Sequence, residues 1–268
     1  MDNKAASELR PVADIYDEPW VAWTLRTAGP HLHPGRELAT VQLAERAVQF
    51  GFPPGGRVLE VASALGGPAR FVARHFSATV ICLDMNPRMQ VALQSSAWAE
   101  GLGLRCQPVL ARAERMPLAD ASLDAAWSQD AMCHMDKSAV LAEVSRVLKP
   151  GAIFAFTDWI ARQPLSSEDA ELLARLWGFP ALFRLAAYVA LLDGCGFDVL
   201  LAEDRTPTLV AFRAGTPWDQ ELFEHGYAQR WGDAEVARQR APGEAWQTLV
   251  GAGKTGVGMF IARRRSIE

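Results

Sequence analysis

Short apolar runs alternate with amphipathic stretches along most of the chain from residue 57 onward. Continuous apolar runs predict buried strands at 57–61, 79–83, 104–109, 123–128, 152–157, 197–202 and 256–262. Helical periodicity predicts helices at 37–50, 68–75, 88–100, 137–148 and 185–194. This alternation is typical of a doubly wound α/β fold with a mostly parallel sheet, here of seven strands.

The flanking regions lack this regularity. The first part of the chain is polar and punctuated by proline, with a short helix predicted around Trp20 and Trp23. Irregular helical segments interrupt the pattern again after the fifth predicted strand. Three regions are therefore expected: a lid at 1–36, a core at 37–160, and a remainder of the same domain at 161–268, with insertions at about 161–184 and 205–250 that cover a substrate site.

Composition narrows the class of protein. The chain has 268 residues and a net charge of −4, and its one cluster of basic residues is Arg263-Arg264-Arg265, so we expect no nucleic-acid binding. No apolar leader follows Met1, and charges interrupt the longest apolar stretch at 182–202, so we expect no membrane span and a cytoplasmic protein. Four scattered cysteines without CxxC spacing favour reduced thiols.

The most informative segment joins the first predicted strand to the next helix. The strand carries Glu60 near its end, and the loop that follows is built from small residues, among them Ala62, Ala64 and Gly66. Small side chains let a ligand approach the backbone and the N-terminus of the next helix. The second strand ends in Asp84, where an acid can accept hydrogen bonds from two ribose hydroxyls. We therefore expect a cofactor that contains ribose.

Four segments occur in a fixed order: the run Glu60 to Arg70, Asp84, Leu123 to Asp130, and Leu148-Lys-Pro-Gly151. Together they resemble the class I S-adenosylmethionine-dependent methyltransferases over about residues 55–160. Gly66-Gly-Pro-Ala-Arg70, Ser128-Gln-Asp-Ala-Met-Cys-His134 and Phe156-Thr157-Asp158 are most similar to sarcosine/dimethylglycine and phosphoethanolamine N-methyltransferases. Tocopherol and sterol C-methyltransferases are further off. The stretch His31 to Thr40 resembles the segment that caps the cofactor in the phosphoethanolamine enzymes.

The resemblance implies a Rossmann-like core that binds S-adenosylmethionine and releases S-adenosylhomocysteine. Glu60 is expected near the cofactor's ammonium, Gln129 near its carboxylate, and the loop 62–66 beneath its methionine part. Asp84 would hold the ribose hydroxyls and Met85 would pack on the adenine. The further cofactor-binding residues that we predict are His33, Arg112 and Ala113.

Two features depart from the family pattern. Ala62 and Ala64 stand where relatives usually carry glycine, and alanine in a left-handed backbone costs roughly 1 kcal/mol. Arg112 stands where relatives commonly have an aspartate that accepts a hydrogen bond from the adenine amino group, which a guanidinium cannot do. Either Glu114 or a backbone carbonyl takes over that role, or the affinity for the cofactor is reduced.

His134 is the predicted catalytic base, because it follows the fourth strand at the edge of the sheet where ligands bind. Phosphoethanolamine enzymes use an aspartate and a histidine that match Asp130 and His134, and Asp130 would orient the imidazole. Tyr16 is a further candidate on the lid. A structural histidine and a surface tyrosine are the alternatives.

Nine tryptophans are unusual for this length. Several fall in segments that should converge above the sheet, and four are predicted to contact the substrate: Trp20, Trp23, Trp159 and Trp177. An aromatic wall would bind a methylated amine through cation–π attraction or a flat apolar acceptor by stacking, and ordinary core packing is the alternative. The lysine and tyrosine set that holds phosphate in phosphoethanolamine enzymes has no match in 205–250, which disfavours a phosphobase.

The predicted function is methyl transfer to a small metabolite or natural product, with nitrogen as the preferred acceptor and oxygen, carbon or sulfur left open. A dehydrogenase that binds NAD is disfavoured because the loop lacks the glycines that admit a pyrophosphate. A non-catalytic scaffold with a methyltransferase fold is the other alternative. We expect no metal, because the histidines lack supporting ligands. A homo-oligomer stays open.

Overall fold

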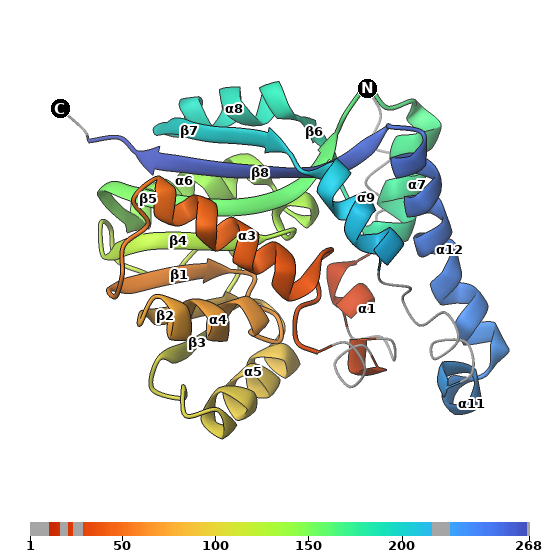
Figure 1. Ribbon diagram of the computed structural model, residues 1–268, viewed down its shortest axis with the longest axis horizontal. Helices are drawn as coiled ribbons and strands as arrows, with labels where there is room; N and C mark the ends of the chain where they lie inside the picture. Colours follow the sequence, from red (N-terminus) through yellow and green to blue (C-terminus); the bar gives the residue numbers. More distant parts are fainter. Residues whose placement is uncertain (1–10, 17–20, 24–28, 216–225, 267–268) are drawn as a thin grey trace.

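The structure is a computed structural model that describes residues 11–16, 21–23, 29–215 and 226–266 (Figure 1). A single sheet with strand order β3-β2-β1-β4-β5-β8-β7 forms its centre, and the short strand β6 pairs with β5. Strands β1 to β5 run parallel to one another, and β8 is antiparallel to both β5 and β7. The strands are β1 Arg57–Val61, β2 Thr79–Asp84, β3 Cys106–Leu110, β4 Leu123–Gln129, β5 Leu148–Ala161, β6 Phe183–Arg184, β7 Phe197–Asp204 and β8 Thr255–Arg264.

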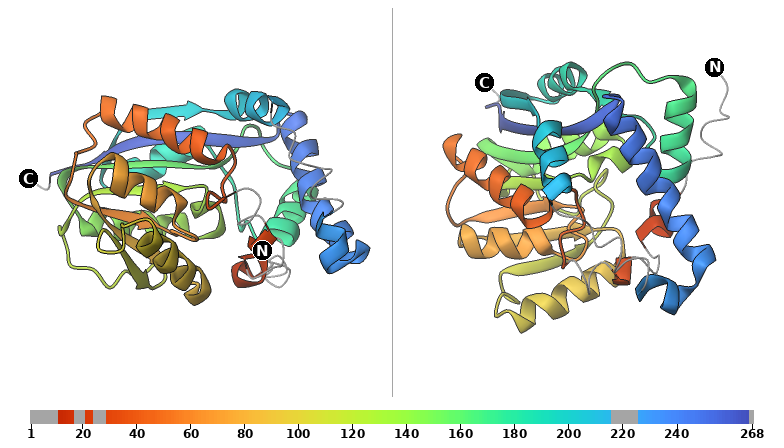
Figure 2. Two further views of the ribbon diagram at one scale, coloured as in Figure 1. Left: turned by 60° about the horizontal axis from the view of Figure 1, so that its bottom comes forward. Right: turned by 45° about the vertical axis from the view of Figure 1, so that its right-hand side comes forward.

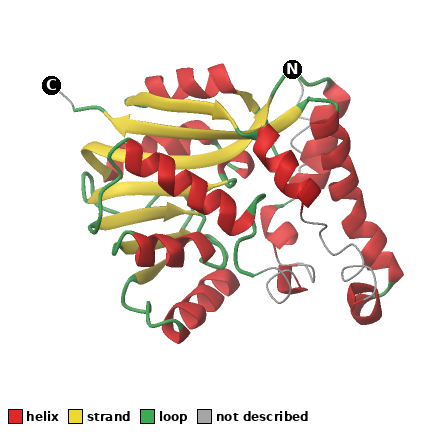
Figure 3. Ribbon diagram, in the orientation of Figure 1, coloured by secondary structure: helices red, strands yellow, loops and turns green. Residues whose placement is uncertain are grey.

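Helices cover both faces of this sheet, as the doubly wound pattern predicts (Figure 3). One face carries α3 (Arg36–Gln49), α4 (Gly67–His75) and α5 (Pro87–Ala99), and the other carries α6 (Lys137–Val147) and α8 (Leu185–Gly194). Consecutive strand residues point to opposite faces. Val58 therefore packs with the first set of helices, while Leu59 packs with the second, and both are fully buried.

A cap of helices stands at the carboxyl ends of the parallel strands, on the right in Figure 1. In the views of Figure 2, α7 and α12 again lie side by side, and their residues are in contact. The cap consists of α1 (Val12–Tyr16), η2 (Met132–His134), α7 (Ser167–Trp177), α9 (Thr206–Gly215), α11 (Ala228–Trp231) and α12 (Asp233–Gly251). Across the described part of the chain, no helix combines the length and apolarity that crossing a bilayer requires.

Strand β5 is longer than its apolar run predicts. It begins at Leu148, which pairs with Leu123 of β4 before an irregularity in the register, and it continues to Ala161 because β8 pairs with it from Ile153 to Ala161. Lys149-Pro150-Gly151 therefore opens the strand, whereas the sequence predicted that these residues separate a helix from the strand. The two-residue strand β6 was not predicted, because it is too short to show a periodicity.

Candidate functional site

A cavity of about 930 Å³ lies between the carboxyl ends of the strands and the cap. Its walls come from the loops after β1, β2, β3 and β4 and from α1, α7 and α12. Most of the predicted site residues line it: Tyr16, His33, Glu60, Ala62, Ala64, Asp84, Met85, Arg112, Ala113, Gln129, Asp130, His134, Trp159 and Trp177. Residues far apart in the sequence thus meet at one place.

Three of the predicted site residues are not among the described residues that line the cavity. Gly66 caps the N-terminus of α4 with a φ of 71°, and a Cβ there would lie 2.4 Å from Leu93 Cγ, so its role is to let α4 approach α5. The Trp23 ring packs edge-on against Tyr227 and Trp231 instead of facing the cavity. Trp20 lies outside the described residues.

Asp84 ties the loop after β1 to the end of β2. Its Oδ2 accepts a hydrogen bond from the Ala64 N–H at 2.8 Å, and its Oδ1 accepts one from the Asn86 N–H at 2.8 Å. Burial raises the pKa of Asp84, although these backbone donors oppose the shift. Ala62 and Ala64 adopt the left-handed backbone with φ of 56° and 45°, the conformation for which relatives use glycine.

Two buried polar side chains near this loop hold atoms without partners. The Oε2 atom of Glu60 has no hydrogen bond among the described residues, and burial, with the neighbouring Cys106 and Asp84, raises the pKa of Glu60 well above its ordinary value. The Oε1 atom of Gln129 accepts hydrogen bonds from Thr40 Oγ1 at 2.9 Å and Trp127 Nε1 at 3.1 Å. This orients the amide and leaves its Nε2 donor without a partner.

Thr40 is a residue that sequence reasoning missed. Its buried hydroxyl lies 3.2 Å from His31 Nδ1 and 3.2 Å from His33 Nε2, besides donating to Gln129. Burial lowers the pKa of His31 to about 4 and that of His33 to about 3, so both imidazoles are neutral. The hydroxyl therefore links the segment 31–40 to the end of β4. Threonine at an apolar-looking helix position carries no signal of such a role.

The side chains of His134 and Tyr16 lie next to each other in the cap. Tyr16 Oη lies 3.0 Å from His134 Nε2, and burial, with the positive charge of Lys137, lowers the pKa of His134 to about 4. The carbonyls of Trp177 and Gly178 oppose this shift, but no described group makes a hydrogen bond with Nδ1. The imidazole is thus neutral, and one of its nitrogens lacks a partner.

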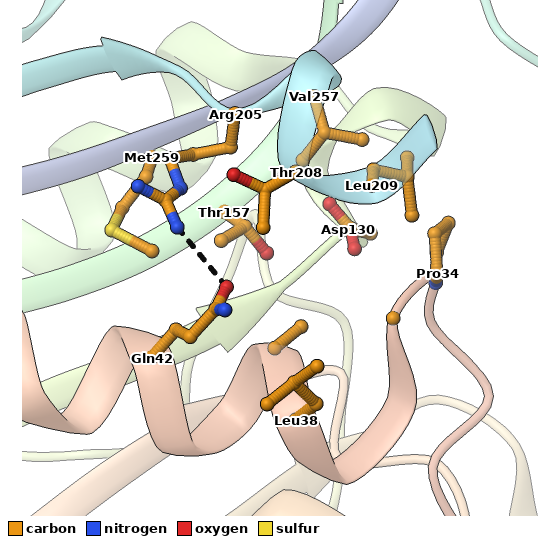
Figure 4. Close-up of a pocket in the computed structure, with 12 residues that line it drawn as sticks. Pro34, Leu38, Gln42, Asp130, Thr157, Arg205, Thr208, Leu209, Val257 and Met259 are labelled. Atoms are coloured by element: carbon orange, nitrogen blue, oxygen red, sulfur yellow. Dashed lines mark hydrogen bonds between the residues drawn. The ribbon is translucent and has the colours of Figure 1, made fainter. Parts of the chain in front are cut away.

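Asp130 makes no described hydrogen bond with His134, so Tyr16 has the orienting position that we predicted for Asp130. Burial, together with the charge of Asp158, raises the pKa of Asp130 well above its ordinary value. Its backbone is left-handed with a φ of 53°. A second cavity, of about 40 Å³, lies on the other side of Asp130, bounded by Thr157 and by Arg205, which donates to Gln42 (Figure 4). Asp130 lines both cavities.

Four aromatic residues line the far end of the large cavity, and we call them the aromatic chamber: Trp159, Trp177, Phe179 and Trp246. Trp159 is central, with ring centroids 6.1 Å from Trp177, 5.6 Å from Phe179 and 5.8 Å from Trp246. The rings of Phe179 and His134 are also in T-shaped contact, with their centroids 5.0 Å apart. Phe179 and Trp246 were not predicted, because they lie in the irregular insertions where no periodicity assigns a face.

Comparison with known proteins agrees with this fold. A family model described as a methyltransferase domain matches residues 59–156. The methyltransferase GfsG of Streptomyces halstedii is 33% identical over 74% of this chain and 74% of its own length. A 24-methylenesterol C-methyltransferase 2 of Oryza sativa subsp. japonica is 29% identical over 85% of this chain. A dimethylglycine N-methyltransferase of Parasynechococcus marenigrum is 33% identical over 59% of it.

Solved structures show the same fold. Phosphoethanolamine N-methyltransferase 2 of Haemonchus contortus, in complex with S-adenosyl-L-methionine, has a TM-score of 0.82 at 18% identity, covering 96% of this chain and 61% of that one. The cyclase SpnF has a TM-score of 0.75 at 23% identity, covering 96% of each chain. At these identities the likeness concerns the fold alone.

A Rossmann-like sheet with an acidic residue at the end of its second strand and a capped cavity is typical of the class I methyltransferase architecture. The chain belongs to the class I S-adenosylmethionine-dependent methyltransferases. It spans 63% and 58% of the lengths of the rice and Arabidopsis thaliana sterol C-methyltransferases that it matches.

Proposed function

We propose that this chain transfers a methyl group from S-adenosylmethionine to a small-molecule acceptor. The observation that carries the proposal is a set of buried polar atoms without described partners on the walls of one cavity: Glu60 Oε2, Gln129 Nε2, Asp130 Oδ1 and His134 Nδ1. Each such atom costs about 1–3 kcal/mol unless a ligand satisfies it. A cofactor with an ammonium and a carboxylate group, together with a polar acceptor, fits this set.

Each polar group of the cofactor would face a residue at or just after the end of a strand. Glu60 would accept a hydrogen bond from the ammonium, and Gln129 Nε2 would donate to the carboxylate. Asp84 has lone pairs left for the two ribose hydroxyls beyond those that its backbone donors use. Glu114, which Arg112 holds at 3.2 Å, takes the place of the family's aspartate at the adenine amino group.

When bound, the sulfonium supplies an electrophilic methyl group. The neutral His134 imidazole then accepts a hydrogen bond from the acceptor and takes up its proton as the nucleophile attacks. Tyr16 holds the ring in place through its hydroxyl. The insertions at 161–184 and 205–250 contribute the chamber that excludes water from the reaction.

Nitrogen is the acceptor atom that we propose. Aromatic rings beside His134 stabilise the positive charge that an amine gains on methylation, and each such contact contributes about 0.5–2 kcal/mol. Relatives named as sterol C-methyltransferases and as a dimethylglycine N-methyltransferase modify different atoms, so carbon and oxygen acceptors stay as alternatives.

Calorimetric titration with S-adenosylhomocysteine and, separately, NAD tests the proposal. We expect micromolar binding of the first and none of the second. Asp84→Ala should weaken the binding at least about tenfold, because it removes two ribose contacts. His134→Ala is the matched control: it should leave this affinity nearly unchanged while lowering turnover by about 10²-fold or more. If neither ligand binds, the proposal is wrong and a non-catalytic role takes its place.

A further inference from the structure

The large cavity has two ends that the sheet order keeps apart. The loops after β2 and β3 contribute Asp84, Met85 and Arg112, whereas β5 and the cap contribute the aromatic chamber. Strands β2 and β5 are separated by β1 and β4, which corresponds to roughly 14 Å at the usual spacing between strands. The proposed cofactor would occupy the first end. The chamber, beside Tyr16 and His134, is then the place for the acceptor.

The chamber is apolar and has room for a large ligand. At about 930 Å³, the whole cavity is near the top of the range for ligand sites and holds the cofactor together with a sizeable second molecule. Apolar side chains join the four aromatic rings around the acceptor end: Ile15, Met135, Leu176 and Pro242. A small zwitterion or phosphate ester would leave most of these surfaces without contacts.

Few cationic side chains line the cavity, and the buried Lys137, whose charge reaches His134, donates to the Ala181 carbonyl and is not a lining residue. Among the described lining residues, the cationic side chains are Arg88, Arg112 and Arg240. Arg88 and Arg112 belong to the cofactor end, on α5 and after β3, and Arg112 is paired with Glu114. Arg240 is an exposed residue of α12. A buried anionic group requires a paired cation, and the described chamber residues do not offer a buried one.

The apolar wall also contains a polar atom of Trp177. The Trp177 Nε1–H is shielded from water and has no hydrogen-bond partner among the described residues. A buried indole N–H usually finds an acceptor. An oxygen on the bound molecule would satisfy this donor and orient the ring or chain that carries it.

We propose that the acceptor is a predominantly apolar molecule without anionic groups, larger than an amino acid, with an oxygen atom that accepts a hydrogen bond from Trp177. The inference rests on the proposed function for the location of the cofactor. It separates this chain from proteins whose names specify small charged acceptors, such as dimethylglycine or phosphoethanolamine.

Calorimetry on the protein saturated with S-adenosylhomocysteine tests the proposal with four probes. We expect saturable binding of 2-acetonaphthone and of 2-ethylnaphthalene, which has the same shape without the oxygen. Dimethylglycine and phosphoethanolamine should not bind at millimolar concentration. Trp177→Phe should weaken the binding of 2-acetonaphthone by about 3–10-fold, as expected for the loss of one hydrogen bond, and leave the affinity for 2-ethylnaphthalene within about twofold of wild type. Trp98→Phe, an exposed position outside the cavity, is the matched control and should change neither.

The proposal is overturned if the charged compounds bind as tightly as the naphthyl probes, or if the naphthyl probes do not bind. If Trp177→Phe weakens the binding of both naphthyl probes equally, the proposed hydrogen bond from Trp177 is wrong. Failure of the proposed function is a separate result, since S-adenosylhomocysteine would then not bind. In that case, naphthyl titration of the protein without cofactor still reports on the chamber.

Discussion

Ala62 and Ala64 adopt a backbone conformation that residues other than glycine generally avoid, with φ of 56° and 45°. Both line the cavity, and the N–H of Ala64 is held by Asp84 at 2.8 Å. The surrounding contacts thus maintain a strained loop at the proposed cofactor site. Local strain that persists in this way is common where a ligand binds.

Ala64→Gly should increase the free energy of unfolding by about 0.5–1 kcal/mol, because glycine relieves the left-handed strain and loses part of that gain through its more flexible unfolded state. Urea denaturation measures the change. Ala142→Gly, at an exposed site inside α6, should instead lower stability by about 1 kcal/mol. A loss of stability in Ala64→Gly would contradict the assignment of strain.

At the scale of elements, a buried network holds η2, the short helix that carries His134. Asp158 of β5 accepts a hydrogen bond from the Cys133 N–H at 2.9 Å and another from the Tyr188 hydroxyl of α8. Lys137, at the start of α6, is buried nearby and donates to the Ala181 carbonyl at 3.0 Å. Asp158 is fully buried, so its carboxyl depends on these partners.

Tyr188→Phe should lower the free energy of unfolding by roughly 1–3 kcal/mol, since Asp158 loses a donor that water cannot replace. Turnover should fall because η2 shifts, while the affinity for S-adenosylhomocysteine stays within about twofold. Denaturation, steady-state kinetics and calorimetry give the three readouts. Ser122→Ala removes an exposed hydroxyl that donates to Ala119, and it serves as the control with little effect on any of them. Unchanged turnover in Tyr188→Phe would reduce the network to a purely structural role.

At the scale of the whole molecule, burial of ionisable groups couples stability to pH. The folded chain keeps His134 neutral down to about pH 4, whereas an unfolded histidine titrates near 6.5. Between these values the unfolded chain binds a proton that the folded chain does not. His134 therefore makes the protein less stable as the pH falls through this window. Glu60 and Asp130, whose pKa values are raised, act in the opposite direction.

Comparison with His134→Gln isolates the histidine from these carboxyls. We expect wild type to lose more unfolding free energy than the variant between pH 7 and about pH 4.5, because glutamine does not titrate in this window. Urea denaturation at both pH values measures the difference. Equal losses in the two proteins would mean that the imidazole is not kept neutral by the fold.

Local sequence patterns were enough to predict the sheet and the helices that cover it, whereas the cofactor-binding roles of residues at the strand ends stay predictions. Apolar runs and helical periodicity are local signals, and Glu60, Asp84 and Gln129 stand at strand ends whose position follows from those signals. The length of β5 was underestimated, because its ends are set by pairing with β4 and β8 and not by its own apolar residues.

The assembly of the aromatic chamber and of the His134–Tyr16 pair follows from tertiary packing and not from local sequence patterns. Tyr16 reaches His134 from 118 positions away, and Phe179 and Trp246 join Trp159 from two separate insertions. The pairing of His134 with Tyr16 instead of Asp130 likewise depends on where the lid settles. Such contacts depend on the packing of irregular segments, which no periodicity along the chain encodes. Burial, which keeps the His134 imidazole neutral, exists only once these segments have come together.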